Sequence, residues 1–369
     1  MSYEILREVL SPEELKELYP IPQHSAELKL KRDQEIKDIL SGASDKFLVI
    51  IGPCSADNED AVCDYITRLA KVSEKVQDKV LIVPRIYTNK PRTTGEGYKG
   101  IVHQPDPEKK PNLQEGLIAM RKMHLRAINE TGLTAADEML YPENWPYVSD
   151  ILSYVAVGAR SVEDQQHRLT ISLMDIAAGM KNPTSGDLSV MLNSCVAAQS
   201  GHTFFYRQHE VKTSGNKFAH TILRGAVNKH GQCIPNYHYE DLIHLAEIYE
   251  KSGLKNPAVI VDTNHANSGK KYLEQIINSL SRAGLVRSVR GAKGGYLLSR
   301  TAGEITVEDI LLATEGSLAP MSCAEDNESC DKYGDCVMSF IWTQMYEAVS
   351  QVVKKITLAD LVDRKTQKG

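Results

Sequence analysis

The sequence lacks several features that would place it in an obvious class. It contains no apolar run long enough to span a membrane, no secretory signal and no internal repeat, so we expect no membrane partner. It also has no excess of basic residues. The formal net charge is −5 at pH 7, which argues against non-specific binding to nucleic acid. A length of 369 residues allows one large domain and one smaller domain.

Cysteine occurs at seven positions without a signal peptide, which favours a reducing, cytoplasmic location. Four of these thiols are scattered, while Cys323, Cys330 and Cys336 cluster in a polar, acidic segment. Three thiols at this spacing can ligate an iron–sulfur cluster, which usually has four ligands, but no His follows Cys336. Two alternatives therefore stay open, a cluster with an unidentified fourth ligand or three surface thiols.

A basic, glycine-rich segment at residues 85–100 directly follows the apolar run at residues 80–84. Its four cations are Arg85, Lys90, Arg92 and Lys99. Arg presents a planar fork to phosphate or carboxylate, Lys supplies a point charge, and Gly lets the backbone approach closely. Thr93 and Thr94 add neutral donors at the same place. We therefore predict a site for a phosphorylated anion here, in preference to a solvated basic loop.

The same segment contains a G-x-G-x-x-G pattern at residues 95–100. A dinucleotide fingerprint of this kind should connect a strand directly to a helix. Here residues 87–94 intervene after the predicted strand, and residues 101–112 contain three prolines and do not show a helical pattern. The context therefore argues against a nicotinamide cofactor.

Short apolar runs recur along the amino-terminal part, and most precede a helix-like stretch. They span residues 47–54, 80–87, 134–138, 154–160, 176–181, 203–207 and 258–265. Such alternation favours parallel strands buried on both faces, and seven units fit an α/β fold of the (β/α)8 TIM-barrel type better than an open sheet. Active sites of these barrels lie at the carboxyl ends of the strands. The polar residues at those ends are Cys54, Arg85, Glu138, Arg160, Lys181, Arg207 and His265.

At this point the chain resembles type I 3-deoxy-D-arabino-heptulosonate-7-phosphate (DAHP) synthase over residues 10–275. The matching motifs are Gly52-Pro-Cys-Ser55, Lys90-Pro-Arg-Thr-Thr94, Gly158-Ala-Arg160 with Glu163, Gln165, His167 and Arg168, Gly179-Met-Lys-Asn182, Ile222-Leu-Arg-Gly225 and Asn264-His-Ala-Asn-Ser268. The resemblance implies the first step of the shikimate pathway to aromatic amino acids. In that step phosphoenolpyruvate condenses with erythrose 4-phosphate on a divalent metal, and the enzyme is a transferase.

The resemblance also implies residue roles. Arg85, Arg160, Lys181 and Arg224 would bind phosphoenolpyruvate, while Arg92 and Thr93 would bind the sugar phosphate with Lys90 near its aldehyde. Lys99 and Glu138 would lie near the attacking water. Cys54 and His265 match two metal ligands, and a thiolate–imidazole pair suits Mn, Fe, Co, Zn or Cu. The metal would act as a Lewis acid on the aldehyde oxygen.

The sequence departs from this family after Lys271. The expected eighth strand, with a metal-binding Glu at its end and a metal-binding Asp beyond it, does not follow. Residues 272–284 instead have the pattern of an amphipathic helix, residues 285–299 that of a basic hairpin, and residues 305–316 that of a short capped helix. We therefore expect a barrel with a gap between its first and seventh strands, weak metal binding and low or no turnover.

Residues 272–363 resemble part of the Rrf2 family of winged-helix transcription regulators, with the hairpin at the wing's position. The helices that would dock a recognition helix are missing, so we expect DNA binding to be weak or absent. A long helix over residues 336–362 is also predicted. In the family such a helix pairs two subunits, and the alternative is that it packs on its own core.

The predicted organisation is therefore an extension at residues 1–45, a DAHP synthase-like barrel at 46–271 and an Rrf2-like segment at 272–369. The enzyme is favoured because it accounts for most of the chain, and we expect it to form a homo-oligomer. A DNA-binding or redox-sensing regulator is the alternative.

Overall fold

The computed structural model describes residues 3–90, 92, 96–256, 258–289, 295–326, 330 and 333–366. The chain divides into two compact units, Met1–Asn267 and Ser268–Gly369, which we call the barrel unit and the tail unit. Each is described by itself. The domain limits predicted at residues 45/46 and 271/272 stay predictions.

Two helices precede the sheet of the barrel unit, α1 (Pro12–Leu18) and α2 (Gln23–Leu40). Helix α1 begins with a capping box, in which Ser11 and Glu14 each accept a hydrogen bond from the other's backbone N–H. The chain breaks between these two helices at residues 19–22, where two prolines prevent continuation of α1.

Seven parallel strands form the barrel wall. They are β1 (Phe47–Ile51), β2 (Val80–Pro84), β3 (Ala136–Glu138), β4 (Tyr154–Val157), β5 (Ala177–Lys181), β8 (Ala219–Leu223) and β11 (Val259–Val261). β1 pairs with β2, a bridge from Arg85 to Ala136 leads to β3, and the order continues through β4, β5 and β8 to β11. The predicted α/β fold of the TIM-barrel type is confirmed.

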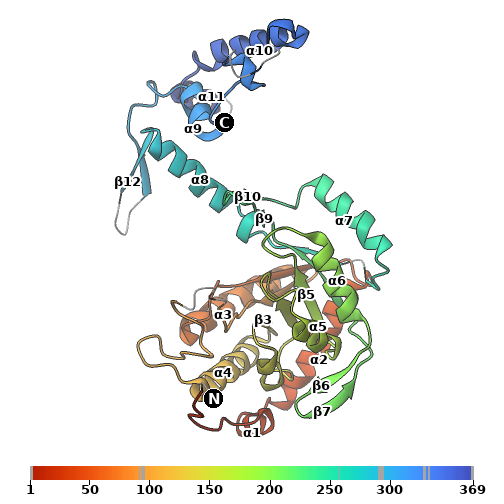
Figure 1. The fold of residues 1–369 in the computed structure, drawn as a ribbon. Coiled ribbons are helices and arrows are strands. Elements are labelled where there is room, and N and C mark those ends of the chain that lie inside the picture. The colour runs from red at the N-terminus through yellow and green to blue at the C-terminus, as the bar shows by residue number, and fades with distance from the viewer. Residues whose placement is uncertain are drawn as a thin grey trace. The chain divides into compact units, whose positions relative to one another are not determined.

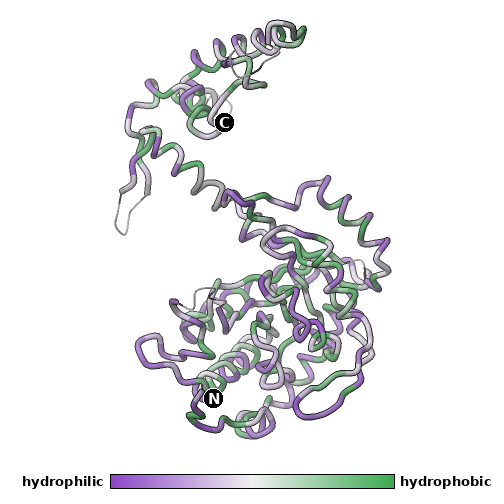
Figure 2. The backbone as a smooth tube through the Cα atoms, viewed as in Figure 1, coloured by the Kyte–Doolittle hydropathy of each residue, from purple (hydrophilic) through white to green (hydrophobic). Residues whose placement is uncertain are grey.

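Helices surround these strands, as Figure 1 shows around β3 and β5. The helices are α3 (Glu59–Val76), α4 (Leu113–Thr131), η1 (Pro142–Tyr147), α5 (Gln165–Ser172), α6 (Leu188–Gln199), α7 (Tyr239–Lys251) and η2 (His265–Asn267). Green and purple residues alternate along α7 in Figure 2, and its Leu245 and Tyr249 are buried. No helix among the described residues is both long and apolar enough to cross a membrane.

One predicted barrel strand is wrong. Residues 203–207 do not enter the wall but form the hairpin β6 (Thr203–Tyr206) with β7 (His209–Lys212). The sixth wall strand is β8, whose five residues are all buried although His220 and Thr221 are polar. Because these two residues are polar, β8 does not form an apolar run and could not be recognised as a wall strand from its sequence. The short pair β9 (Ala226–Val227) and β10 (Cys233–Ile234) completes the unit.

The predicted gap in the barrel is confirmed. Among the described residues, β1 pairs only with β2 and β11 pairs only with β8, so each leaves one edge free. A cavity of about 550 Å³ lies between these edges and is lined by Leu48, Ile50 and Ile260 among others. Ile36 and Leu40 of α2 pack with Leu48 in the same apolar cluster. The barrel therefore has a core, but its wall is open where an eighth strand would stand.

The tail unit contains the hairpin and helices that the sequence predicted. Its elements are α8 (Gly269–Arg282), β12 (Val286–Val289), β13 (Gly295–Leu298), α9 (Val307–Glu315), η3 (Ser322–Ala324), η5 (Tyr333–Asp335), α10 (Val337–Val353) and α11 (Leu358–Thr366). As predicted, β12 and β13 form a separate antiparallel sheet, and Thr306 and Asp309 form a capping box. The single long helix is wrong, because Thr357 bridges to Thr306 and caps α11, which separates it from α10.

Candidate active site

The strand-end side chains meet in one cavity of about 230 Å³. Its lining includes every member of the predicted set Arg85, Lys90, Arg92, Arg160, Lys181, Arg224 and His265, together with Cys54 and Glu138. These residues come from the ends of all seven wall strands and the loop after β2. The predicted convergence is confirmed, whereas the individual roles stay predictions.

Two of the predicted residues, Lys99 and Arg207, do not join this cavity in the structure. Lys99 is exposed and absent from the lining, although its backbone carbonyl accepts a hydrogen bond from Lys90 N–H at 3.0 Å. Thr93 lies outside the described residues. Arg207 follows β6 in the hairpin and pairs with Glu13 at 2.8 Å, so its assignment to a strand end of the wall is wrong. The reason is the misassigned strand, which carried Arg207 with it.

Two cations of the cavity, Arg85 and Lys181, lie against the aromatic ring of Tyr87. The Arg85 guanidinium lies 4.6 Å and the Lys181 ammonium 5.6 Å from the centroid of the Tyr87 ring. Arg85 also donates through Nε and Nη2 to the Pro53 carbonyl, at 3.2 and 3.0 Å. A Cβ at Gly52 would lie 2.2 Å from the Arg85 carbonyl, so only glycine permits this approach of β1 to β2. The cations are therefore held in place before any anion arrives.

Lys181 is buried between two carboxylates. Its side chain is 5% exposed, and its Nζ lies 3.4 Å from Asp262 Oδ2 and 4.0 Å from Glu138 Oε1. Burying a lone ammonium ion costs several kcal/mol, and these two carboxylates offset part of that cost. Glu138 is close to Gly158 as well, because a Cβ at Gly158 would lie 2.7 Å from Glu138 Oε1.

Arg224 is a buried cation of the cavity that lacks a partner for one of its donors among the described residues. The residue is 8% exposed, and its Nη1 is buried without a hydrogen-bond partner among the described residues. Burial lowers the pKa of the guanidinium, while the nearby Asp262 opposes this effect. A buried charged donor normally has a partner. Arg224 is therefore suited to receive an anionic oxygen from a ligand in the cavity.

Cys54 and Lys90 interact directly at the mouth of the cavity. Lys90 Nζ lies 3.1 Å from Cys54 Sγ and also donates to the Cys54 carbonyl. The hydrogen bond from Lys90 lowers the pKa of the Cys54 thiol, against the effect of its partial burial. A thiolate is the form of cysteine that binds metals.

His265 is oriented by a carboxylate that the sequence analysis did not single out. Its Nδ1 donates to Asp262 Oδ2 at 2.8 Å, which leaves Nε2 free to bind a ligand or metal. Burial by itself raises the pKa of a carboxyl group, yet the hydrogen bond with His265 and the charge of Lys181 hold the pKa of Asp262 well below its usual range. His265 has φ +53°, an uncommon value for a residue other than glycine.

Two residues were therefore missed by the sequence analysis, Asp262 and Tyr87. Asp262 follows the last residue of β11, so the rule that selected His265 could have selected it too. Tyr87 is fully enclosed, and burial raises its pKa well above the ordinary value. Its sequence position among apolar residues gave no sign that Arg85 and Lys181 would lie against its ring.

The residues present supply only part of a metal site. Cys54 and His265 line the same cavity, but within the described part of the chain no group of three or more His, Cys, Asp or Glu side chains could hold a metal ion. Catalytic metal sites usually supply three protein ligands. A resident metal therefore does not fit this donor set as it stands.

The three clustered cysteines of the tail unit differ in their exposure and do not form a metal-binding group among the described residues. Cys323 is buried, Cys330 half-buried and Cys336 exposed, and all three are described as free thiols. They are not gathered into a group that could hold a metal within the part of the chain that the structure describes. The alternative of three surface thiols is wrong for Cys323, which is buried, and the iron–sulfur cluster stays a prediction.

The comparisons with known proteins find two families, whose matches overlap over residues 241–293. Residues 22–293 match the DAHP synthetase I family, and residues 241–364 match the Rrf2 family, described as iron-dependent transcriptional regulator. The phospho-2-dehydro-3-deoxyheptonate aldolase of Haemophilus influenzae is 39% identical over 73% of this chain and 74% of that relative. The Phe-sensitive enzyme of Escherichia coli strain K12 is 36% identical over 73% of this chain and 76% of its own length.

A solved structure agrees with these sequence matches. The phospho-2-dehydro-3-deoxyheptonate aldolase from Francisella tularensis superposes with a TM-score of 0.68 at 30% identity, covering 77% of this chain and 82% of that chain. Both families that the sequence motifs indicated are therefore found, each over the expected part of the chain.

Proposed function

The chain belongs to the DAHP synthetase I family, and we propose that its strand-end cavity binds phosphoenolpyruvate and erythrose 4-phosphate and condenses them with low turnover. The function is that of a transferase in the shikimate pathway to aromatic amino acids. In the reaction, C3 of phosphoenolpyruvate forms a carbon–carbon bond with the aldehyde carbon of erythrose 4-phosphate. Water adds at C2 and inorganic phosphate leaves, which gives DAHP.

The observation that carries this proposal is the unpaired charge in the cavity. Six cationic side chains line about 230 Å³, whereas Glu138 is the one carboxylate in that lining. Such an imbalance is costly without an anion, and both substrates carry a phosphate group. The orphaned Nη1 of Arg224 supports binding of a phosphate or carboxylate oxygen at the buried end of the cavity.

Residue roles follow from the contacts. Arg224, Lys181 and Arg85 lie deepest and would hold the phosphate and carboxylate of phosphoenolpyruvate. Arg92 is exposed and would meet the second phosphate, while the exposed Arg160 would help to hold phosphoenolpyruvate, as the family resemblance implies. Glu138, next to Lys181, is placed to accept a proton from the water that adds at C2.

Low turnover follows from the ligand count. Members of this family generally depend on a metal, which would supply Lewis-acid activation of the aldehyde when bound. Cys54 and His265 are the residues that would hold it, and two ligands bind weakly. We therefore expect added Mn²⁺ to bind with low affinity and to raise the rate only slightly.

The test is phosphate release from phosphoenolpyruvate plus erythrose 4-phosphate, measured with and without Mn²⁺. Arg224→Met should lower kcat/KM about ten- to hundredfold, because a hydrogen bond to a charged group is worth about 1.5–3 kcal/mol. The matched control is Arg68→Met, which removes an exposed cation paired with Asp64 on α3 and should leave kcat/KM unchanged. Equal rates for both variants would contradict the proposal.

A second function, DNA binding by the tail unit, rests on the match of residues 241–364 to the Rrf2 family. The helix α8 and the hairpin β12–β13 follow one another as in a winged helix. Within the tail unit α8 is the first described helix, so no earlier helix of that unit docks it. We propose that affinity for duplex DNA is weak. Fluorescence anisotropy that gives nanomolar binding at physiological salt would contradict this.

A further inference from the structure

The open edge of the barrel presents backbone groups as well as apolar side chains. In β1, Phe47 N–H donates to Lys79 and the Ile51 carbonyl accepts from Arg85, so residues 47 and 51 face β2. Because backbone groups alternate along a strand, Leu48 and Ile50 point their N–H and C=O groups into the gap. In β11, Asp262 N–H donates to Leu223, so Val259 and Val261 point into the gap from the other side. An occupant must therefore offer hydrogen bonds along both of its edges.

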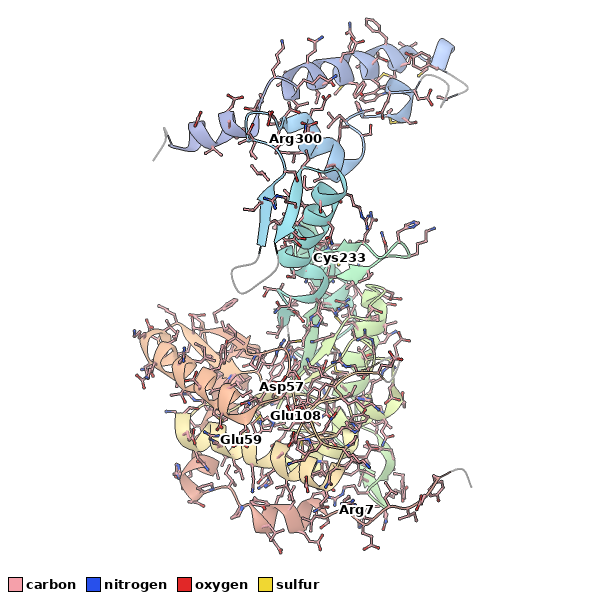
Figure 3. The ribbon with its side chains drawn as sticks, turned by 90° about the vertical axis from the view of Figure 1, so that its left-hand side faces the viewer. Arg7, Asp57, Glu59, Glu108, Cys233 and Arg300 are labelled. Carbon is pink, nitrogen blue, oxygen red and sulfur yellow. The ribbon has the colours of Figure 1, made fainter. Side chains whose placement is uncertain are left out.

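Only a strand whose two edges are both free can form hydrogen bonds with β1 on one side and β11 on the other. Strands β12 and β13 pair with one another, as do β6 and β7, so each of these strands has one edge free at most. Residues 3–9 are different. They are exposed, belong to no helix or strand, and make no backbone hydrogen bond among the described residues. Figure 3 shows the segment that carries Arg7 extending away from the helices of the barrel unit.

The side chains of this segment match the groove. Its large apolar residues are strongly exposed, with Ile5 at 77% and Leu6 at 81%. Ile5 and Leu6 are adjacent, so they point to opposite faces, as a strand buried on both sides requires. Glu4 and Glu8 flank them, and the groove carries Lys46 near one end and Arg85 near the other.

The anchor of Leu10 argues against insertion into the segment's own barrel. Leu10 is fixed by Gln114 Oε1 and by the Tyr147 hydroxyl, both at 2.9 Å, on the elements α4 and η1 that flank β3 in the chain. Three strand spacings separate β3 from the gap, about 14 Å along the wall. An extended segment of seven residues reaches about 23 Å. If four residues fill the groove, the remaining three reach about 10 Å, which is too short.

We propose that the groove between β1 and β11 binds residues 3–9 of a second copy of this chain as an eighth strand. Each copy would offer one segment and one groove, so the exchange can be reciprocal and closes as a dimer. The added strand would supply hydrogen bonds to residues 48, 50, 259 and 261 and cover the apolar cavity of about 550 Å³. This inference is independent of the catalytic proposal.

The test maps contacts in the full chain. Leu6 is replaced by photoreactive benzoylphenylalanine, and this protein is mixed with ¹⁵N-labelled wild-type chain before irradiation. Mass spectrometry should find crosslinks from position 6 to residues 47–50 or 258–261 of the labelled copy. Crosslinks only within one copy, only to other surfaces, to a different co-purified polypeptide, or none at all would overturn the proposal.

A second measurement uses amide hydrogen exchange at Leu48, Ile50, Val259 and Val261. Exchange at these amides should slow at least tenfold as the protein concentration is raised through the dimerisation range. The double variant Ile5→Asp/Leu6→Asp should abolish this slowing, and both positions are exposed, so the fold should persist. Leu30→Asp, at an apolar side chain 67% exposed on α2, is the matched control and should retain the slowing. Rates that do not depend on concentration would overturn the proposal.

Discussion

The barrel unit and the tail unit contain similar amphipathic helices but differ in what covers them. On α4 of the barrel unit, Met120, Met123 and Ile128 are between 0% and 2% exposed. On α10 of the tail unit, Val337 is 85% and Phe340 67% exposed. Apolar periodicity is present in both helices, so the sequence pattern is the same. The difference is that α4 has a sheet to pack against, whereas the tail unit offers one two-stranded hairpin.

The comparison shows which part of the chain carries its own stability. Burial of apolar area is the main favourable term of folding, at roughly 25 cal/mol per Å². All four apolar clusters of buried residues that the structure describes lie in the barrel unit. The tail unit is therefore the part whose stability depends most on additional contacts.

The largest expected effect is a core truncation in the barrel unit. Ile171 on α5 is 0% exposed, so Ile171→Ala should lower the free energy of unfolding by about 2–5 kcal/mol. Ile341 on α10 is 43% exposed, and Ile341→Ala should change it by less than about 0.5 kcal/mol. Urea denaturation of both variants measures the contrast. An equal loss for Ile341→Ala would mean that the face of α10 is covered in solution.

The second effect is a pH dependence confined to the barrel unit. Burial lowers the pKa of His220 to about 4, and its ring hydrogen-bonds Tyr154 and the Phe218 carbonyl. In the unfolded chain the pKa of a His is about 6.5, so unfolding takes up a proton between these two pH values. The contribution is therefore fully present above pH 6.5 and is lost as pH falls towards 4. It amounts to about 3 kcal/mol.

The measurement is urea denaturation of the wild-type chain at pH 7 and pH 4.5, compared with His220→Gln. The variant should show a smaller loss of stability on acidification than the wild type. His209→Gln, at an exposed His in the hairpin, is the control and should behave like the wild type. Identical pH profiles for His220→Gln and the wild type would show that His220 does not titrate as its burial requires.

A smaller effect tests whether local helix signals act equally in both units. Asn58 caps α3 by accepting from Ala61 N–H at 2.9 Å, and Thr306 caps α9 by accepting from Asp309 N–H at 3.1 Å. Replacing either with Ala should cost about 1 kcal/mol. Thermal unfolding monitored by circular dichroism checks this. No detectable cost for Thr306→Ala would mean that α9 is not part of a cooperatively folded tail unit.

The smallest effect concerns Arg207, which was predicted at the end of a wall strand but lies in the β6–β7 hairpin. Arg207 pairs with Glu13 on the surface, with both side chains at least 40% exposed. Arg207→Ala should therefore change stability by no more than about 1 kcal/mol and leave kcat/KM unchanged. A large loss of kcat/KM would place Arg207 back among the substrate-binding cations.

Much of the barrel could be predicted from sequence, because strands buried on both faces are short apolar runs with polar ends. The prediction failed where this link between polarity and burial is broken. β8 is fully buried although it contains His220, which Tyr154 and a backbone carbonyl satisfy. β6 is apolar in sequence but half-exposed in a hairpin. The Tyr154 partner of His220 and the pairing of β6 with β7 depend on the folded structure, and the apolar pattern of the sequence does not reveal them.

The sequence predicted the cations of the site but missed Asp262. Charged strand ends identified the cations, since parallel strands bring their carboxyl ends together. Asp262 lies directly after β11, but its contact with Lys181 joins two distant parts of the chain and is not visible in the local sequence. Lys99 was included because it lies in the basic segment at residues 85–100 and because the family resemblance implied a role for it, but the structure leaves it exposed outside the cavity.

The most direct test of the account is calorimetric titration of the full chain with phosphoenolpyruvate in the absence of metal. The account predicts saturable binding of one molecule per chain, weakened about ten- to hundredfold by Arg224→Met and unaffected by Arg68→Met. It also predicts that inorganic phosphate competes for the same site. Absence of binding by the wild-type chain, or equal binding by the Arg224→Met variant, would contradict the assignment of this cavity as the substrate site.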